Sequence, residues 1–360
     1  MKFLDPRYKI PNKLFITSRS TEGFGLMQAL VLRNGFGLDN LVVAPVPDPT
    51  PGPGQVLVRI RAAALNYRDL LIARGHYNPR LPLPRVLGSD AAGEVVAVGS
   101  GVTTLKPGDP VVGCFLQQWE RGPITEAVAR STLGSEREGV LAELAVFDQG
   151  GVVPLPPGLS FAEAATLPCA ALTAWHALTS GGCGPGKTVL LQGTGGVSIF
   201  ALQLAKALGA RVLITSGHDE KLARALALGA DAGVNYTTNP DWDKWAREQT
   251  AGTGVDIVVE VGGAGTLERS TKAARYGGYI ALIGVLAGTG NFNPIHVLMK
   301  ALCLQGIFVG SRAQFEEMNR FIVAQRIKPV IDRVFPLAEA LAAIRYLESG
   351  SHFGKIVVTV

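Results

Sequence analysis

Cysteine is scarce in this 360-residue sequence, and the few cysteines are far apart. They stand at positions 114, 169, 183 and 303, with no C-x-x-C pair among them. This spacing argues against a disulfide-stapled extracellular domain and favours reduced thiols in a cytoplasmic protein. The N-terminal stretch MKFLDPRYKIPNKLF carries charges and prolines where a secretory signal needs an apolar run, which agrees with a cytoplasmic location.

Long apolar runs and blocks of one charge are also missing. The longest strongly apolar segment, Tyr279-IALIGVLAG, is too short to span a bilayer, so we expect no membrane insertion. The 34 basic and 29 acidic residues give a net charge of +5, but they are interspersed and form no basic stripe. This pattern favours a mixed solvated surface around a site for an anionic ligand, and it argues against nucleic-acid binding.

Glycine and proline are abundant, with 44 and 22 residues, and 47% of the chain is hydrophobic. Such a composition favours many short loops, and the length predicts two domains. Residues 1–26 lack clear periodicity and are interpreted as an N-terminal arm. From 27 to 157 strand-like runs alternate with turn signals, which indicates a small irregular β-barrel domain. The runs lie at 55–65, 92–99, 109–115 and 143–147.

From 158 to 312 the pattern changes to strands and helices in alternation, which specifies a parallel sheet with helices on both faces. Ligands of such sheets bind at the carboxyl ends of the strands. After 313, two helices and a closing strand are expected to return to the first domain. The expected strands are 189–192, 211–215, 232–236, 255–261, 278–284 and 303–310, and the expected helices are 197–208, 219–228, 240–250, 265–276 and 294–301.

The stretch GGCGPGKTVLLQGTGGVS, residues 181–198, contains two overlapping phosphate-loop patterns. Gly181-x4-Gly186-Lys187-Thr188 fits a nucleotide-triphosphate loop, but an Ala/Leu-rich helical stretch precedes it and a strand follows it. A phosphate loop needs a strand before it and a helix after it, so this pattern is interpreted as a turn. Gly193-x-Gly195-x-x-Ser198 has the required context and predicts a dinucleotide site, with Ser198 in place of the third glycine.

The residues after the second strand of this half indicate the phosphorylated dinucleotide. Ser216 stands where an NAD site places a carboxylate for the ribose hydroxyls, and Lys221 follows shortly after. A hydroxyl and an ammonium suit a 2′-phosphate, which a carboxylate would repel, so NADP(H) is the predicted cofactor. Tyr236 either stacks on adenine or packs ordinarily at a strand end.

Six motifs are spread along the chain. They are Asn66-Tyr67-Arg68-Asp69-x5-Gly75-x-Tyr77, Gly88-Ser89-Asp90, Lys106-Pro107-Gly108-Asp109, Leu167-Pro168-Cys169-x3-Thr173-Ala174, Gly193-Thr194-Gly195-Gly196-Val197 and His352-x-Gly354-Lys355. With these motifs the chain resembles the medium-chain dehydrogenase/reductase superfamily over residues 27–360, in particular its zinc-free branch of quinone oxidoreductases and enoyl reductases. The resemblance implies an α/β protein with a GroES-like β-barrel catalytic domain (27–157 and 313–360), a Rossmann NADP-binding domain (158–312), and a homodimer.

The superfamily's zinc alcohol dehydrogenases hold their catalytic metal with Cys, a His-Glu pair and a later Cys or Asp. At the matching positions this chain has Asn66, Ser89 and Asp90, and only Cys169 remains. One thiolate and one carboxylate are too few ligands for a tetrahedral zinc site, so we expect no metal. Without a Lewis acid, conjugate reduction of an enone or quinone is easier than alcohol oxidation, because it needs only hydrogen-bond donors and a proton source.

The resemblance also implies site residues. Asn66 contacts the nicotinamide or its ribose, Tyr67 is the candidate proton donor or carbonyl partner, and Tyr77 lines the substrate pocket. Arg68 and Asp69 are interpreted as structural. The implied cofactor contacts are Asn66, Thr173, Gly193, Thr194, Gly195, Gly196, Val197, Ser216, Lys221, Tyr236, Gly262, Ile283, Val285, Phe308 and Val309.

The sequence therefore predicts an NADPH-dependent oxidoreductase that acts on a small carbonyl, enone or quinone substrate. Two alternatives remain at this point. One is a zinc-free alcohol or aldehyde dehydrogenase, and the other is a protein that binds NADPH without catalysis.

Overall fold

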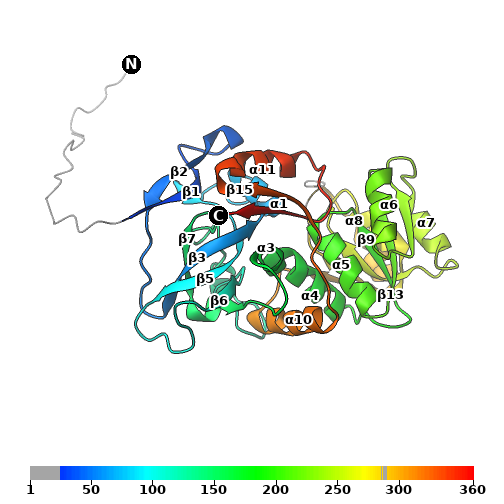
Figure 1. Ribbon diagram of the computed structural model, residues 1–360. Coiled ribbons are helices and arrows are strands. Elements are labelled where there is room, and N and C mark those ends of the chain that lie inside the picture. The colour runs from blue at the N-terminus through cyan, green and yellow to red at the C-terminus, as the bar shows by residue number, and fades with distance from the viewer. Residues whose placement is uncertain (1–24, 285, 287–289) are drawn as a thin grey trace, which may run out of the picture.

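The computed structural model describes residues 25–284, 286 and 290–360 (Figure 1). Residues 1–24 of the predicted N-terminal arm lie outside the described residues, and the first strand, β1, begins at Leu26. No helix in the described part of the chain has the length and apolar character needed to cross a membrane.

The N-terminal part of the chain forms two sheets, and the C-terminal strands β15 and β16 join the larger one. A three-stranded antiparallel sheet has the order β2-β1-β4, and a larger sheet has the order β15-β16-β3-β5-β6-β8, with β7 also paired to β3. Alternate residues of β3 are buried, as the period of two requires of a strand with one face on the core. The strands are β1 (Leu26–Leu32), β2 (Leu41–Pro47), β3 (Gln55–Ala64), β4 (Arg85–Val86), β5 (Asp90–Val98), β6 (Pro110–Gly113), β7 (Leu144–Asp148), β8 (Val152–Pro154), β15 (Ile331–Pro336) and β16 (Lys355–Thr359).

The predicted parallel sheet is confirmed, with six strands in the order β11-β10-β9-β12-β13-β14. All five of its strand pairs are parallel. This order, in which the chain starts in the middle and reverses direction once, is that of the Rossmann fold. The strands are β9 (Thr188–Gln192), β10 (Arg211–Ser216), β11 (Ala232–Asn235), β12 (Val255–Glu260), β13 (Ala274–Leu282) and β14 (Cys303–Gly306).

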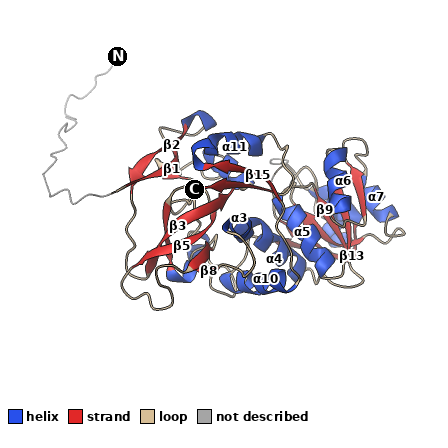
Figure 2. Ribbon diagram, in the orientation of Figure 1, coloured by secondary structure: helices blue, strands red, loops and turns tan. Residues whose placement is uncertain are grey.

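Helices cover both faces of the parallel sheet (Figure 2). Val189 and Leu191 of β9 belong to the same buried cluster as Phe200 of α5, whereas Leu190 belongs to a cluster with Trp242 of α7. The apolar strand β9 thus contributes side chains to the buried clusters on both faces of the sheet, because successive side chains point to opposite faces. The helices of this half are α5 (Gly196–Ala207), α6 (Asp219–Ala227), α7 (Trp242–Glu248), α8 (Leu267–Ala273) and α9 (Ile295–Met299).

The segment between the two sheets differs from the continuous helix that its Ala/Leu content suggests. A π-helical turn, Leu167–Ala171, separates α3 (Phe161–Ala165) from α4 (Leu172–Ser180). Pro168 lies in this turn and cannot donate a backbone hydrogen bond, which favours a local break in the ladder. The break brings the backbone N–H of Cys169 to 3.0 Å from Asp90 Oδ2.

The C-terminal segment returns to the first half, as predicted. Strand β16 pairs with β3, and helix α11 (Ala340–Glu348) packs against α1 (Tyr67–Ala73). Helix α10 (Arg312–Ala324) packs on α4 in the centre of Figure 1. One buried cluster contains Ala64 of β3 as well as Phe200 of α5, so the two halves share a core. Sequence reasoning did not predict β15, α1 or the pairing of β1 with β2.

Candidate functional site

The glycine-rich turn at 193–196 links β9 to the N-terminus of α5. Gly193 has φ of 70°, which favours glycine, and Gly195 is the N-cap residue of α5. Ser198 is buried, and its Oγ donates to the carbonyl oxygen of Gln192 at 2.6 Å. The serine that replaces the third glycine therefore fastens the helix to the strand end and leaves the anion-binding end of α5 intact.

The overlapping triphosphate pattern lies between α4 and β9. A helix precedes it and a strand follows it, as the sequence predicted. Gly182 and Gly186 both have positive φ, 65° and 79°, which identifies this segment as a turn.

A buried carboxylate organises the adjacent loop at the carboxyl end of β12. Glu260 is fully buried, and its Oε1 accepts from the backbone N–H groups of Gly262 and Gly263 at 2.8 and 2.9 Å. Its Oε2 accepts from Gln192 Nε2 at 2.7 Å. A Cβ at Gly262 would lie 2.1 Å from Thr266 Oγ1, so this position requires glycine. Sequence reasoning missed Glu260, although an acidic residue that ends an apolar strand is a detectable signal.

The predicted ribose-binding residues gather at the end of β10. Ser216 is buried, and its Oγ contacts both the carbonyl oxygen and the backbone N–H of His218, at 3.1 and 3.2 Å. Tyr236 is 44% exposed and lies against Gly217, since a Cβ there would be 2.7 Å from Tyr236 Oη. The Nζ of Lys221 donates to the carbonyl oxygen of Gly350. Asp219 and Glu220 lie in the first turn of α6.

A chain of buried polar groups lies in the catalytic half, around the N-terminus of α1 and the start of β5. Lys355 Nζ donates to Asn66 Oδ1 and to the carbonyl oxygen of Leu65, each at 2.6 Å. Asn66 Nδ2 then donates to Ser89 Oγ at 3.3 Å, and Ser89 Oγ donates to Asp90 Oδ1 at 2.8 Å. Burial raises the pKa of Asp90, and the nearby Lys355 charge opposes that rise.

Lys355 also touches the phosphate-loop end of the cofactor domain. The side chain of Lys355 packs against Gly196, because a Cβ at Gly196 would lie 2.7 Å from Lys355 Cδ. The residue before Lys355, Gly354, donates its backbone N–H to the carbonyl oxygen of Thr194 at 3.0 Å. Lys355 is only 3% exposed. The aliphatic part of the Lys355 side chain thus packs beside the α5 N-terminus, where a pyrophosphate would lie, while its ammonium is bonded to Leu65 and Asn66. The sequence singled out Lys355 as part of a motif but gave it no role.

Helix α1 carries the remaining predicted catalytic residues. Asn66 is its N-cap, and Asp69 completes a capping box by accepting from the Asn66 N–H at 2.8 Å. Burial raises the pKa of Asp69 to about 6. Tyr67 and Tyr77 are partly exposed, at 37% and 38%. Both tyrosine rings therefore reach the surface of the catalytic half.

Arg68 joins helix α1 to a distant loop and also contacts Tyr77, a predicted pocket residue. Its guanidinium donates to the carbonyl oxygen of Leu133 at 2.8 Å and to Ser135 Oγ at 3.1 Å. It also lies 4.8 Å from the ring centroid of Tyr77 and 4.6 Å from that of Phe115. These contacts tie the 115–135 loop to helix α1 and fix the orientation of Tyr77.

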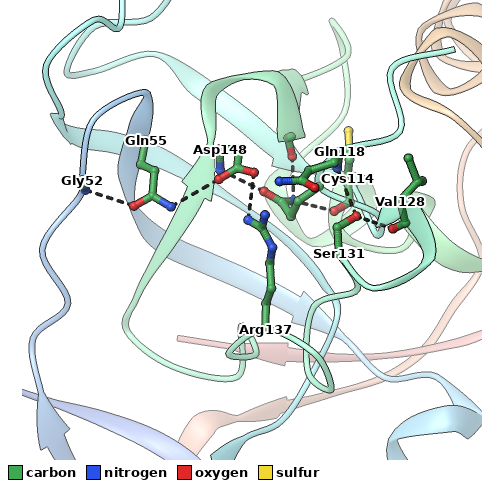
Figure 3. A network of polar contacts seen from close by, with 10 residues as sticks. Gly52, Gln55, Cys114, Gln118, Val128, Ser131, Arg137 and Asp148 are labelled. Atoms are coloured by element: carbon green, nitrogen blue, oxygen red, sulfur yellow. Dashed lines mark hydrogen bonds and ion pairs between the residues drawn. The ribbon is translucent and has the colours of Figure 1, made fainter. Parts of the chain in front are cut away.

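That loop is held by a polar network (Figure 3). Arg137 pairs with Asp148 at 2.9 Å, and Asp148 accepts from Gln55 Nε2 at 3.2 Å. Ser131 Oγ donates to the carbonyl oxygen of Val128 at 2.6 Å and accepts from the N–H of Gln118 at 3.2 Å. Ordered side chains therefore anchor the loop at both of its ends.

The other predicted cofactor residues lie on the cofactor half. Thr173 is buried in α4, and Ile283 follows β13. Phe308 packs edge-on against Phe115, with ring centroids 6.1 Å apart. Val309 has φ of 55°, an unusual backbone conformation for a β-branched residue, and its carbonyl oxygen contacts His176 Nδ1 at 2.8 Å. Val285 lies outside the described residues.

Comparison with known proteins agrees with this arrangement. A family model for the alcohol dehydrogenase GroES-like domain matches residues 52–157, and one for zinc-binding dehydrogenases matches residues 196–324. A zinc-type alcohol dehydrogenase-like protein of Schizosaccharomyces pombe is 43% identical over 314 residues, which are 85% of this chain and 91% of that protein. The chain belongs to the medium-chain dehydrogenase/reductase superfamily.

Two further members of the superfamily differ in the activities that their names give. An acryloyl-coenzyme A reductase of Metallosphaera sedula is 31% identical over 88% of this chain and 96% of its own length. A solved structure of an NAD-dependent alcohol dehydrogenase is 40% identical, covers 93% of this chain and 100% of its own, and has a TM-score of 0.84. The predicted GroES-like and Rossmann architecture is thereby confirmed, and the chain is an oxidoreductase that uses a nicotinamide cofactor.

The residues at the superfamily's catalytic metal position do not fit a zinc ion. Asn66 Oδ1 accepts from the Lys355 ammonium, a cation that zinc would have to displace. Both carboxylate oxygens of Asp90 are already engaged, by Ser89 Oγ and by the backbone N–H of Cys169. Within residues 25–284, 286 and 290–360, no three His, Cys, Asp or Glu side chains are grouped as metal ligands.

Proposed function

We propose that this protein is an NADPH-dependent reductase that delivers hydride to an activated C=C bond or a quinone without a metal ion. The observation that carries this proposal is the Lys355–Asn66 contact at 2.6 Å, at the position where zinc-dependent members hold their metal. An amide and an ammonium supply hydrogen bonds and charge, but they do not polarise an alcohol as a Lewis acid does. Conjugate reduction needs only such donors.

The described residues fit a phosphorylated dinucleotide. The Gly193–Gly196 turn would hold the pyrophosphate, while Thr173, Phe308 and Val309 would contact the nicotinamide end. Ser216 ends β10 where an NAD-specific site carries a carboxylate, and Lys221 lies one turn into α6. The absence of a carboxylate at position 216 supports a preference for the 2′-phosphate.

Side chains of the protein would then stabilise and protonate the negative charge that hydride addition creates on the substrate. When bound, the cofactor supplies the hydride. Hydride addition at the β-carbon of an enone would leave an enolate on the substrate, and Tyr67 Oη would donate a proton to that enolate, which gives the saturated ketone directly or by tautomerisation of the enol. Asn66, held by Lys355 and Ser89, orients the nicotinamide end. Tyr77, held over Arg68, lines the substrate side.

The test compares NADPH oxidation with three acceptors of different chemistry. We expect turnover of 1,4-benzoquinone and of an enone to exceed turnover of a saturated aldehyde. The acryloyl-coenzyme A reductase supports this order, because an acryloyl group is a conjugated alkene. Faster turnover of the aldehyde would favour an alcohol or aldehyde dehydrogenase instead, as the 40% identity to such an enzyme allows. NADPH binding without turnover of any acceptor would identify a non-catalytic binding protein.

Metal removal provides a separate prediction. Dialysis against EDTA is expected to leave kcat within about twofold of its starting value, because the Asn66, Ser89 and Asp90 side chains already satisfy one another without a metal. The measurement is steady-state turnover of the acceptors before and after dialysis, with elemental analysis of the same samples. Stoichiometric zinc, together with activity that EDTA abolishes and zinc restores, would overturn the metal-free proposal.

A homodimer and a cytoplasmic location remain part of this proposal. Strand β14 is the edge of the six-stranded sheet, and the neighbouring helix α9 exposes Leu298 and Met299 at 74% and 66%. An unpaired strand edge beside exposed apolar side chains is suited to pairing across a two-fold axis.

A further inference from the structure

The segment 350–355, here called the C-terminal strap, connects the two ends of the predicted cofactor site. At one end the carbonyl oxygen of Gly350 accepts from Lys221 Nζ on α6. At the other end Gly354 pairs with the glycine-rich turn through Thr194 and Gly195. In Figure 1 this segment follows α11 and runs beside the Rossmann half before β16 returns to the catalytic sheet.

His352 lies in the middle of the strap, between the ribose end and the pyrophosphate end of the site. Its ring is partly buried, and its Nδ1 is a buried atom with no hydrogen-bond partner among the described residues. Because buried polar atoms are rarely left without a partner, this one needs an explanation. A ligand that binds along the strap would supply a polar partner to the ring.

The charges around His352 are mostly positive. Lys221 on α6 and Lys355 on β16 lower the pKa of His352 as positive charges, Asp332 on β15 opposes them, and Arg224 on α6 pairs with Asp332. Asp332 is already engaged, since it accepts from Arg224 Nη1 at 3.2 Å and from Tyr346 Oη at 2.6 Å. Burial, Lys221 and Lys355 together lower the pKa of His352 to about 4. The ring is therefore neutral at physiological pH, and the positive charges near it outweigh the negative charge of Asp332.

We propose that His352 is a specificity-determining residue that, together with Lys221, binds the 2′-phosphate of NADP(H). This inference rests on the proposed NADP(H) preference. It adds the imidazole of His352, a residue of the catalytic half, to the 2′-phosphate site that Ser216 and Lys221 of the cofactor half would otherwise form alone. The strap holds His352 near Lys221 through the Lys221–Gly350 contact. A phosphate dianion fits this field, and it can accept a hydrogen bond from the imidazole.

Proton uptake follows from the same electrostatics. A phosphate dianion beside His352 makes the electrostatic potential at the ring negative and so stabilises the imidazolium. The pKa of His352 therefore rises on NADP(H) binding. The complex therefore takes up a proton at pH values between the free and the bound pKa. NAD(H), which has no 2′-phosphate, produces no such uptake at this residue.

The test measures the dissociation constants of NADP⁺ and NAD⁺ by isothermal titration calorimetry with the full-length protein. The unaltered protein is compared with the His352→Asn variant, and His296→Asn on helix α9 is the matched control. We expect His352→Asn to weaken NADP⁺ binding about tenfold, as a hydrogen bond to a charged group does. NAD⁺ binding should stay within twofold, which also shows that the variant is folded. His296→Asn should change neither dissociation constant.

The second readout is the proton balance at pH 6.5, from titrations in two buffers of different ionisation enthalpy. The unaltered protein should take up more protons with NADP⁺ than His352→Asn does, and the two should not differ with NAD⁺. Unchanged NADP⁺ affinity in His352→Asn, or an equal loss for both dinucleotides, would overturn the role of His352 while the NADPH proposal stands. Tighter binding of NAD⁺ than of NADP⁺ by the unaltered protein would overturn both.

Discussion

Replacing Lys355 with methionine is expected to lower kcat/KM by about 100-fold or more, because the substitution removes a buried cation from the polar chain around Asn66. The variant leaves Asn66 Oδ1 and the carbonyl oxygen of Leu65 without their donor, and it removes the charge that opposes protonation of Asp90. It also alters the side chain whose Cδ packs at Gly196, beside the proposed pyrophosphate site. The measurements are dinucleotide affinity and steady-state turnover.

The matched control is Lys328→Met. Lys328 is more exposed and bonds the carbonyl oxygen of Gly158, so its loss should change the free energy of unfolding by no more than about 0.5 kcal/mol. Lys355→Met is expected to destabilise the fold by about 3 kcal/mol, since removing one member of a buried charged network leaves its partners unsatisfied. A folded Lys355→Met variant with unaltered affinity and kcat/KM would contradict the role given to this residue.

Replacing Tyr67 with phenylalanine is expected to lower kcat by about 10²- to 10⁴-fold with an enone substrate, the range associated with loss of a general acid. Dinucleotide affinity and stability should not change, because the ring is 37% exposed and only a hydroxyl is lost. The measurement is kcat and KM with enone and NADPH, together with the solvent deuterium isotope effect on turnover.

Tyr77→Phe is the matched control, since it removes the same group from a tyrosine that is 38% exposed. Its ring packs over Arg68, so the pocket wall survives the substitution, and we expect a change in KM with little change in kcat. A large loss of kcat in Tyr77→Phe, with normal turnover in Tyr67→Phe, would exchange the roles of the two tyrosines.

The sequence predicted the features that depend on local pattern. Strand and helix periodicity around residues 181–198 distinguished the dinucleotide turn from the triphosphate pattern, because each motif requires its own flanking elements. The alternation of strands and helices after residue 158 likewise predicted the parallel sheet, since consecutive parallel strands need a crossover helix. These inferences involve residues close together in the chain.

The features that the sequence did not predict depend on contacts between distant segments. Lys355 reaches Asn66 across 289 positions, and the Lys221 charge acts on His352 only because the strap returns to the cofactor half. Helix α1 was missed because seven residues are too few to show a clear helical period. The π-helical turn at Leu167–Ala171 was missed because the Ala/Leu content on both sides of it favours a continuous helix.

The central claim is that hydride from NADPH reaches an activated C=C bond in a site without metal. Its most direct test is a single turnover of EDTA-treated protein with NADPH deuterated at the transferred C4 position and an enone, followed by mass spectrometry and NMR of the product. Deuterium on the β-carbon of a saturated ketone is the result we predict. Deuterium on the carbonyl carbon of an allylic alcohol, or turnover that begins only after zinc is added, would contradict the claim.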